Sequence, residues 1–158
     1  MILFVANLLL ALLWAMLFGP FTPGNFVVGM IVGFIVLRLG TIGGAGRSYF
    51  RRVINIAAFV GYFLIQVVVA NLKMAMYTLG PIGRLRPGIL TLPLTEGMTD
   101  FEITTLANVI TLTPGTLSME VSDDRTKLFV HFIHIEDKER EIRAIKDGFE
   151  RRLLAATR

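Results

Sequence analysis

The chain is organised around residues 108–118, whose sequence is Asn108-Val109-Ile110-Thr111-Leu112-Thr113-Pro114-Gly115-Thr116-Leu117-Ser118. The stretch has the pattern of a helix end, a sharp turn and the start of a strand. Pro114 lacks an amide hydrogen and cannot continue a helix, and a Pro-Gly pair favours a reversal. Three threonines crowd this reversal, with no nucleophile–base pair or metal-ligand set beside them. We therefore interpret the stretch as a recognition corner.

The residues on both sides of this corner predict a small α/β unit with the order β-α-β-β-α. A capping box of Thr99 and Glu102 begins the helix that Pro114 ends. A turn at residues 122–126 joins the second and third strands, and Asp137 caps the last helix. The expected strands are Ile89–Leu94, Thr116–Val121 and Lys127–Ile135.

Alternation along two of these strands predicts which side chains are buried. In the second strand, Leu117, Met119 and Val121 are expected to point inward. In the third, His131 and His134 fall on opposite faces, so they are not expected to share a metal ion. We expect no metal site, no bound cofactor and, because no catalytic group can be assembled, no enzymatic activity.

Charge divides the chain into two unlike parts. Its 158 residues have a mean hydropathy of +0.65, which is typical of a membrane protein. Residues 1–95 contain seven basic and no acidic residues, whereas residues 96–158 contain nine basic and twelve acidic ones. The net charge of +4 describes neither part. Since the early basic residues flank apolar segments as topology signals do, nucleic-acid binding is not expected.

The apolar part predicts a membrane anchor over residues 1–80, followed by a small cytoplasmic domain over 81–158. Helices are expected at about 2–18, 26–39 and 52–78, of which the first two form a hairpin. Gly29 and Gly33 form a G-x-x-x-G step in the second helix, a spacing that lets two membrane helices pack closely.

The third helix is open to two interpretations. A glycine-rich stretch, Gly40–Gly46, is expected to be a flexible linker before it. Two spans, with the third helix at or dipping into the cytoplasmic interface, place all seven basic residues on one side of the membrane. A full crossing is the alternative that its apolar length permits.

The predicted membrane segments lack the residues of an ion pathway. Proton and ion paths through a bilayer use buried acidic, basic or histidine side chains. None occurs in Ile2–Leu37 or in Val53–Leu72. The chain is therefore expected to be an anchor or an assembly part, with ionisable groups supplied by partners.

Three segments carry a resemblance to a known family. Ala107–Thr116, the turn Val121–Asp124 and the late Phe149–Arg152 are similar to the E subunit of Mrp-type multisubunit cation/proton antiporters. The chain also resembles this family in its length, in its apolar first half and in its small C-terminal domain. The resemblance implies a bacterial inner-membrane assembly that exchanges cytoplasmic sodium for external protons, in which the E subunit is small and serves assembly or activity.

The resemblance also implies partners and a site. The partners are the other antiporter subunits and membrane lipid, and the C-terminal domain faces the cytoplasm. The expected assembly or coupling motif consists of Asn108, Thr111, Thr113, Pro114, Gly115 and Thr116. The alternative function is a membrane-anchored regulatory module that binds a soluble ligand or protein through its α/β unit.

Overall fold

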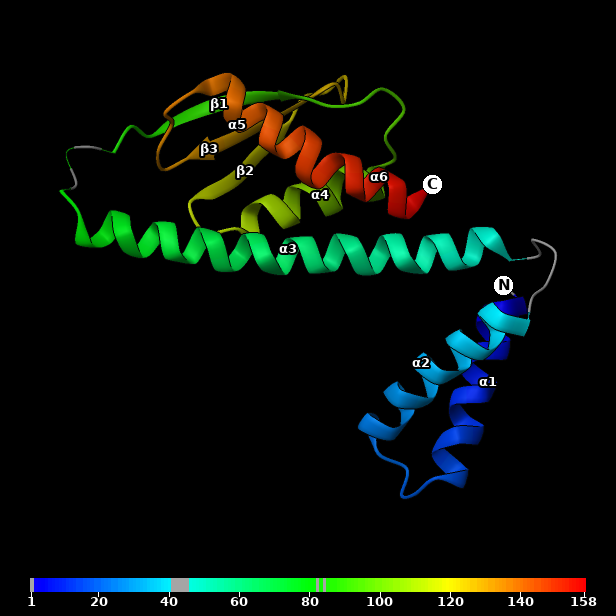
Figure 1. Ribbon diagram of the computed structural model, residues 1–158. Coiled ribbons are helices and arrows are strands. Elements are labelled where there is room, and N and C mark those ends of the chain that lie inside the picture. The colour runs from blue at the N-terminus through cyan, green and yellow to red at the C-terminus, as the bar shows by residue number, and fades with distance from the viewer. Residues whose placement is uncertain (1, 41–45, 82, 84) are drawn as a thin grey trace. The chain divides into compact units, whose positions relative to one another are not determined.

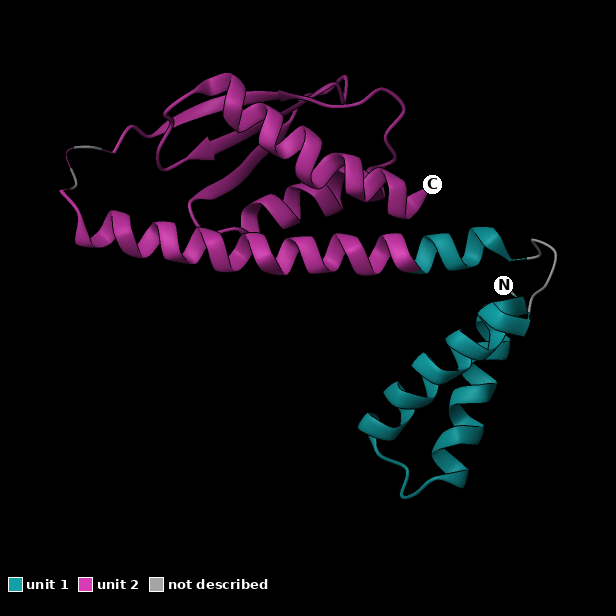
Figure 2. Cartoon of the chain, in the orientation of Figure 1, with its two compact units in different colours: residues 1–53 teal, residues 54–158 magenta. Residues whose placement is uncertain are grey.

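The computed structural model describes residues 2–40, 46–81, 83 and 85–158, so most of the expected 40–46 linker lies outside the described residues. The chain forms two compact units, residues 1–53 and 54–158 (Figure 2). This division differs from the expected boundary at residue 80. Most of the third helix belongs with the α/β elements, because Phe59 joins their hydrophobic core.

The first unit contains a hairpin of α1 (Ile2–Leu17) and α2 (Pro23–Gly40) (Figure 1). α2 begins three residues earlier than expected. The Thr22 hydroxyl accepts a hydrogen bond from the Asn25 amide at 3.2 Å, and Pro23 occupies the first helical position, where proline is well tolerated. α2 is long and apolar enough to span a membrane, whereas α1 is a shorter apolar helix of 16 residues.

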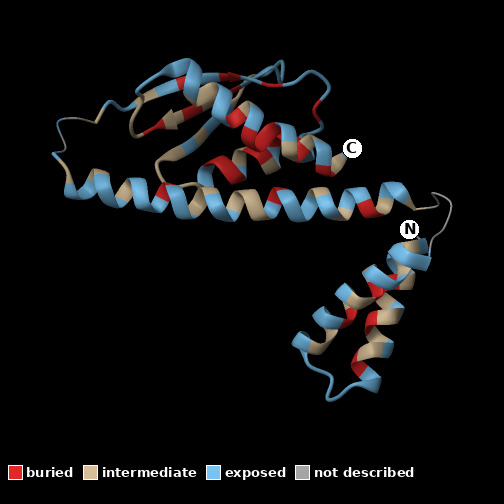
Figure 3. Cartoon of the chain, viewed as in Figure 1, coloured by how far each residue is buried: buried red, intermediate tan, exposed pale blue. Residues whose placement is uncertain are grey.

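The helix α3 (Arg47–Leu79) has 33 residues and begins five residues before the expected start. It also meets the length and composition of a membrane span. One side of it contributes Phe59 and Ala70, each 9% exposed, to the interior of the second unit. Many other residues of α3 are exposed, among them Leu64 and Leu72, and Figure 3 colours much of the helix pale blue.

The α/β elements follow the predicted order. They are β1 (Gly88–Pro93), α4 (Asp100–Leu112), β2 (Thr116–Val121), β3 (Lys127–Phe132), α5 (Lys138–Ile145) and α6 (Arg151–Thr157). The predicted last helix is α5 and α6 together, joined by a π-helical turn at Lys146–Glu150. The three strands form an antiparallel sheet in the order β1-β3-β2.

The core lies between one face of this sheet and the helices. Leu90 pairs with Val130, and Leu92 pairs with Leu128, so β1 and β3 present their branched side chains to the same face. Leu106 of α4 is fully buried against this layer. The capping box at the start of α4 is confirmed, with Thr99 and Glu102 bonded reciprocally.

The predicted facing of β2 is wrong at two positions. Leu117 and Met119 are 48% and 54% exposed, whereas Ser118 points to α4 and donates a hydrogen bond to the Ala107 carbonyl at 3.0 Å. The register shifts between Ser118 and Glu120, where β2 has a bulge against β3. A bulge adds one residue to a strand, so simple alternation cannot give the facing on both sides of it.

Candidate functional site

The predicted corner is a tight turn between α4 and β2. The Thr116 amide donates to the Thr113 carbonyl at 3.2 Å, which closes a four-residue turn with Pro114 and Gly115 at its centre. Gly115 has φ of +96°, the conformation that the third residue of a type II turn requires and that glycine adopts without strain. Proline second and glycine third is the residue pattern of this turn.

Threonine hydroxyls cap the end of α4. The last carbonyls of a helix have no partner within the helix and need one elsewhere. The Thr113 hydroxyl donates to the Val109 carbonyl at 2.9 Å, and the Thr116 hydroxyl lies 2.6 Å from the Ile110 carbonyl and 2.9 Å from the Thr113 carbonyl. These two side chains therefore stop the helix and fix the direction of β2.

The other motif residues take different places. The Thr111 hydroxyl accepts a hydrogen bond from the Ser118 amide at 3.1 Å and so ties α4 to β2. Asn108 is exposed on α4 and takes no part in the hydrogen bonds of the corner given above. The structure thus brings together Thr111, Thr113, Pro114, Gly115 and Thr116, and leaves Asn108 outside.

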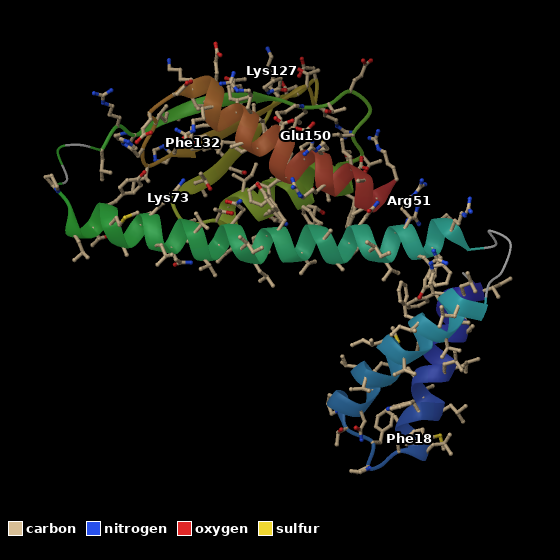
Figure 4. All side chains as sticks on the ribbon, in the orientation of Figure 1. Phe18, Arg51, Lys73, Lys127, Phe132 and Glu150 are labelled. Atoms are coloured by element: carbon tan, nitrogen blue, oxygen red, sulfur yellow. The ribbon has the colours of Figure 1, made fainter. Side chains whose placement is uncertain are left out.

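The corner faces a crevice of about 170 Å³ between α3 and the α/β elements. A Cβ atom placed on Gly115 would lie 3.2 Å from Ile133 Cγ2 and 3.4 Å from Met74 Cε, so the turn approaches α3 closely. Lys73 of α3 and Phe132 of β3, both labelled in Figure 4, belong to the lining. The lining has three parts. α3 contributes Tyr62, Gln66, Val69, Ala70, Lys73, Met74 and Tyr77. The end of α4, the corner, and the end of β3 with the two residues after it contribute Ile110, Thr113–Thr116 and Phe132–His134, and α5 and the π turn contribute Glu141, Ala144, Ile145 and Phe149.

Tyr62 is the centre of the contact between α3 and the last helices. Its ring packs edge-on against Phe149 with centroids 5.3 Å apart, and the Arg152 guanidinium lies 4.1 Å above it. Arg152 also donates to the Asp147 and Gly148 carbonyls at 2.9 and 3.0 Å. The Tyr62 hydroxyl occupies the space that a side chain at Gly148 would need.

Two further contacts extend this seam along α3. At one end, the Asn55 side chain donates to the Ala155 carbonyl at 2.7 Å. At the other, the rings of Tyr77 and His134 lie 5.3 Å apart, and His134 Nδ1 accepts a hydrogen bond from the Arg86 amide at 3.1 Å. We use the name α3 seam for the contacts of Asn55, Phe59, Tyr62, Met74 and Tyr77 with the α/β elements.

The site is a packing contact between α3 and the α/β elements of the same chain. The corner's hydroxyls are used in hydrogen bonds to the backbone, and Lys73 and Glu141 are the charged side chains in the lining of the crevice. Within the described ranges, acidic and histidine side chains form no cluster of three or more that could hold a metal ion. The arrangement holds α3 against the α/β elements.

Sequence reasoning did not find the contacts at the centre of the seam. Phe149 and Arg152 lie in the last segment of the family resemblance, but no contact was assigned to them. Tyr62 carried no motif, and the π turn at Lys146–Glu150 has no simple sequence pattern. The available signal was Gly148, because a glycine inside a helical pattern often marks close packing.

In the hairpin, the two glycines lie where α1 and α2 meet. Gly29 and Gly33 are both buried. A Cβ on Gly29 would lie 2.8 Å from the Ala11 carbonyl oxygen, and one on Gly33 would collide with the side chain of Asn7. The Asn7 amide donates a hydrogen bond to the Tyr49 hydroxyl at 3.3 Å. Such backbone proximity is the arrangement that small residues permit between membrane helices.

Comparisons with protein sequences cover nearly the whole chain. The family model described as a Na⁺/H⁺ ion antiporter subunit matches residues 7–156. The E subunit of the Na⁺/H⁺ antiporter of Alkalihalophilus pseudofirmus is 36% identical over 152 residues, which is 96% of each chain. The E1 subunit of the Na⁺/H⁺ antiporter of Staphylococcus aureus is 35% identical over 147 residues, 93% of this chain and 92% of the relative.

Two solved structures share the fold. A chain of the Mrp complex from a Dietzia species is 28% identical, with a TM-score of 0.51 over 65% of this chain and 96% of that one. A chain of the membrane-bound sulfane sulfur reductase, an archaeal respiratory membrane complex, is also 28% identical, with a TM-score of 0.56 over 96% of both chains.

Proposed function

Because this chain belongs to the E-subunit family of Na⁺/H⁺ antiporters, we propose that it is a non-catalytic subunit of a multisubunit sodium/proton antiporter in the bacterial inner membrane. In this role the hairpin anchors the chain among partner subunits, and the second unit braces the assembly on its cytoplasmic side. The complex as a whole exchanges sodium for protons and so supports pH and sodium homeostasis.

The absence of ionisable side chains in the apolar segments carries this proposal. The apolar stretches Ile2–Leu37 and Val53–Leu72 contain no acidic, basic or histidine residue. A transported ion or proton needs such groups inside the bilayer. The partner subunits therefore supply the ion path, and this chain supplies structure.

Charge supports the cytoplasmic placement of the second unit. Every charged residue before residue 96 is basic, and these residues flank the apolar stretches Ile2–Leu37 and Val53–Leu72. Basic residues near membrane helices are retained on the cytoplasmic side. With the hairpin crossing the bilayer twice, the residues after α2 and the α/β elements lie on that same side.

Purification of the tagged chain in mild detergent from its native membrane tests the assembly role. We expect the other antiporter subunits to copurify in constant proportion to the tagged chain. Recovery of the chain alone, or with one soluble protein, would overturn the antiporter role and favour a membrane-anchored regulatory module.

Substitutions at the corner test whether the second unit braces the complex. Thr113→Ala removes a hydroxyl that caps α4, and loss of such a bond to a helix end costs about 1 kcal/mol. We expect lower yield of the complex and a proportional fall in sodium-dependent proton exchange in everted vesicles. Thr104→Ala, at an exposed position of the same helix, is the matched control. Equal yield and exchange in both variants would remove the corner from the assembly role.

A further inference from the structure

One side of α3 forms a continuous apolar surface. Leu64, Val68 and Leu72 are 57%, 60% and 62% exposed, and they follow one another at helical spacing. We use the name aliphatic face for a set of exposed apolar side chains of α3, which are Ile54, Val60, Leu64, Ile65, Val68, Leu72, Met76 and Leu79. The side chains on this side of α3 project away from the sheet and from α4 in Figure 4.

Three polar side chains of α3 point toward the α/β elements. Asn55 and Tyr62 contact α6 and the π turn, and Tyr77 contacts His134. A helix on a water-exposed surface turns its polar side outward and its apolar side toward the core. α3 does the reverse, so its outer side is built for an apolar environment.

The length of the α3 seam excludes a transmembrane α3 in this fold. From Asn55 to Tyr77 the helix rises about 33 Å, which is the full thickness of a bilayer's hydrocarbon core. Side chains of α3 contact the α/β elements at both ends of that length and at points between them, so these elements lie alongside the whole segment. A crossing α3 would carry them into lipid together with the exposed Arg143–Glu139 ion pair of α5, where charged side chains are strongly disfavoured.

The rim of the aliphatic face is adapted to lipid. The Asn71 side chain donates to the Val67 carbonyl at 2.8 Å, and the Thr78 hydroxyl donates to the Met74 carbonyl at 2.9 Å. Each of these side chains thus has a donor bonded within the helix, which lowers the cost of placing it where water is scarce.

The positive charge of α3 indicates what kind of membrane surface the helix contacts. The helix has four basic and no acidic residues, with Arg51 near its start and Lys73 toward its end. Anionic phospholipids attract such basic residues at the membrane surface. Bulky aliphatic side chains next to basic ones are the composition of helices that lie in the interface plane.

We propose that α3 lies parallel to the bilayer, with its aliphatic face in the acyl boundary of an anionic phospholipid membrane and the α/β elements mounted on its other side. α3 is then a platform that holds the α/β elements at a fixed height above the lipid. This proposal concerns lipid contact and holds whichever cation the complex exchanges.

The chain contains no cysteine, so single cysteines can be introduced into the full-length chain within its complex. Nitroxide labels at Ile54, Leu64, Leu72 and Leu79 report depth through collisions with oxygen and with a water-soluble nickel chelate. The complex with the cysteine-free chain gives the background, and Asp124→Cys in the exposed β2–β3 turn gives the value for water.

We expect the four labels to lie at one shallow depth of about 5–10 Å below the headgroups. A spanning helix instead separates Ile54 from Leu79 by about 38 Å along the membrane normal, and that result would overturn the proposal. Labels shielded from both oxygen and nickel would also overturn it, because they would show that a partner subunit covers the aliphatic face.

An independent measurement uses a membrane-impermeant maleimide. Ser48 and Leu79 are exposed near opposite ends of α3. Cysteines at these two positions are expected to react from the same side of the membrane. Reaction from opposite sides would show that α3 crosses and would refute the proposal without reference to antiport activity.

Discussion

Gly148→Ala tests the α3 seam at its tightest point. A Cβ atom at position 148 would collide with the Tyr62 hydroxyl and lie 3.1 Å from Tyr62 Cζ and 3.3 Å from Tyr62 Cε1. Tyr62 is held in place by Phe149 and Arg152, so the ring cannot move aside freely. The substitution therefore forces α3 away from the π turn or strains the Tyr62 side chain.

Two opposing effects determine how far Gly148→Ala lowers the free energy of unfolding of the second unit. Overfilling a packed site costs typically about 1–3 kcal/mol, whereas replacing glycine by alanine in a helix contributes up to about 1 kcal/mol of stability. We expect Gly148→Ala to lower the free energy of unfolding of the second unit by about 1–2 kcal/mol. Gly61→Ala is the matched control, because the same added methyl group on α3 meets nothing within 4 Å.

Hydrogen exchange of the buried β3 residues Leu128 and Val130, in the full chain in mild detergent, measures this free energy. Tyr62→Phe removes the colliding oxygen, so the double variant is expected to recover at least about 1 kcal/mol of the loss. Strictly additive effects of Gly148→Ala and Tyr62→Phe would refute the packing explanation. A destabilised Gly61→Ala would show that the loss is not specific to the seam.

Two further predictions concern acid stability and the hairpin. Hydrogen bonds from Arg158 hold the pKa of Glu102 at about 2, below its ordinary 4.5, so this carboxylate stabilises the fold above pH 4.5 and the contribution is lost as the pH falls toward 2. Because Arg158 is half exposed, we expect a loss of about 1–2 kcal/mol in urea unfolding followed by circular dichroism, and Glu102→Gln should abolish this acid dependence. Gly33→Ala introduces a methyl group that collides with Asn7 and should destabilise the hairpin by about 1–3 kcal/mol, measured by the fluorescence of the single tryptophan. Gly40→Ala, with nothing within 4 Å, should leave that transition unchanged.

Features that depend on local chemistry could be predicted from the order of residues alone. Thr99 with Glu102 placed the start of α4, and Pro114 with Gly115 placed its end, because capping and turn formation involve neighbouring residues. The order β-α-β-β-α and the apolar hairpin followed from periodicity and composition in the same way. The corner was found for this reason, although its hydrogen bonds to Val109 and Ile110 were not.

The buried sides of β2 and α3 became known only from the packing of the folded chain, whereas the buried faces of β1 and α4 agree with their apolar pattern. Leu117 and Met119 alternate as inward residues do, but the bulge in β2 turns them outward and Ser118 inward. α3 turns its aliphatic face outward and packs its more polar side against the α/β elements, so the rule that apolar sides face the core could not select its packed side. The packed side of α3 is marked by the contact of Tyr62 with Gly148, two residues that are 86 positions apart in the sequence. In β2 and α3, burial depends on contacts between distant parts of the chain, and the local pattern did not give those contacts.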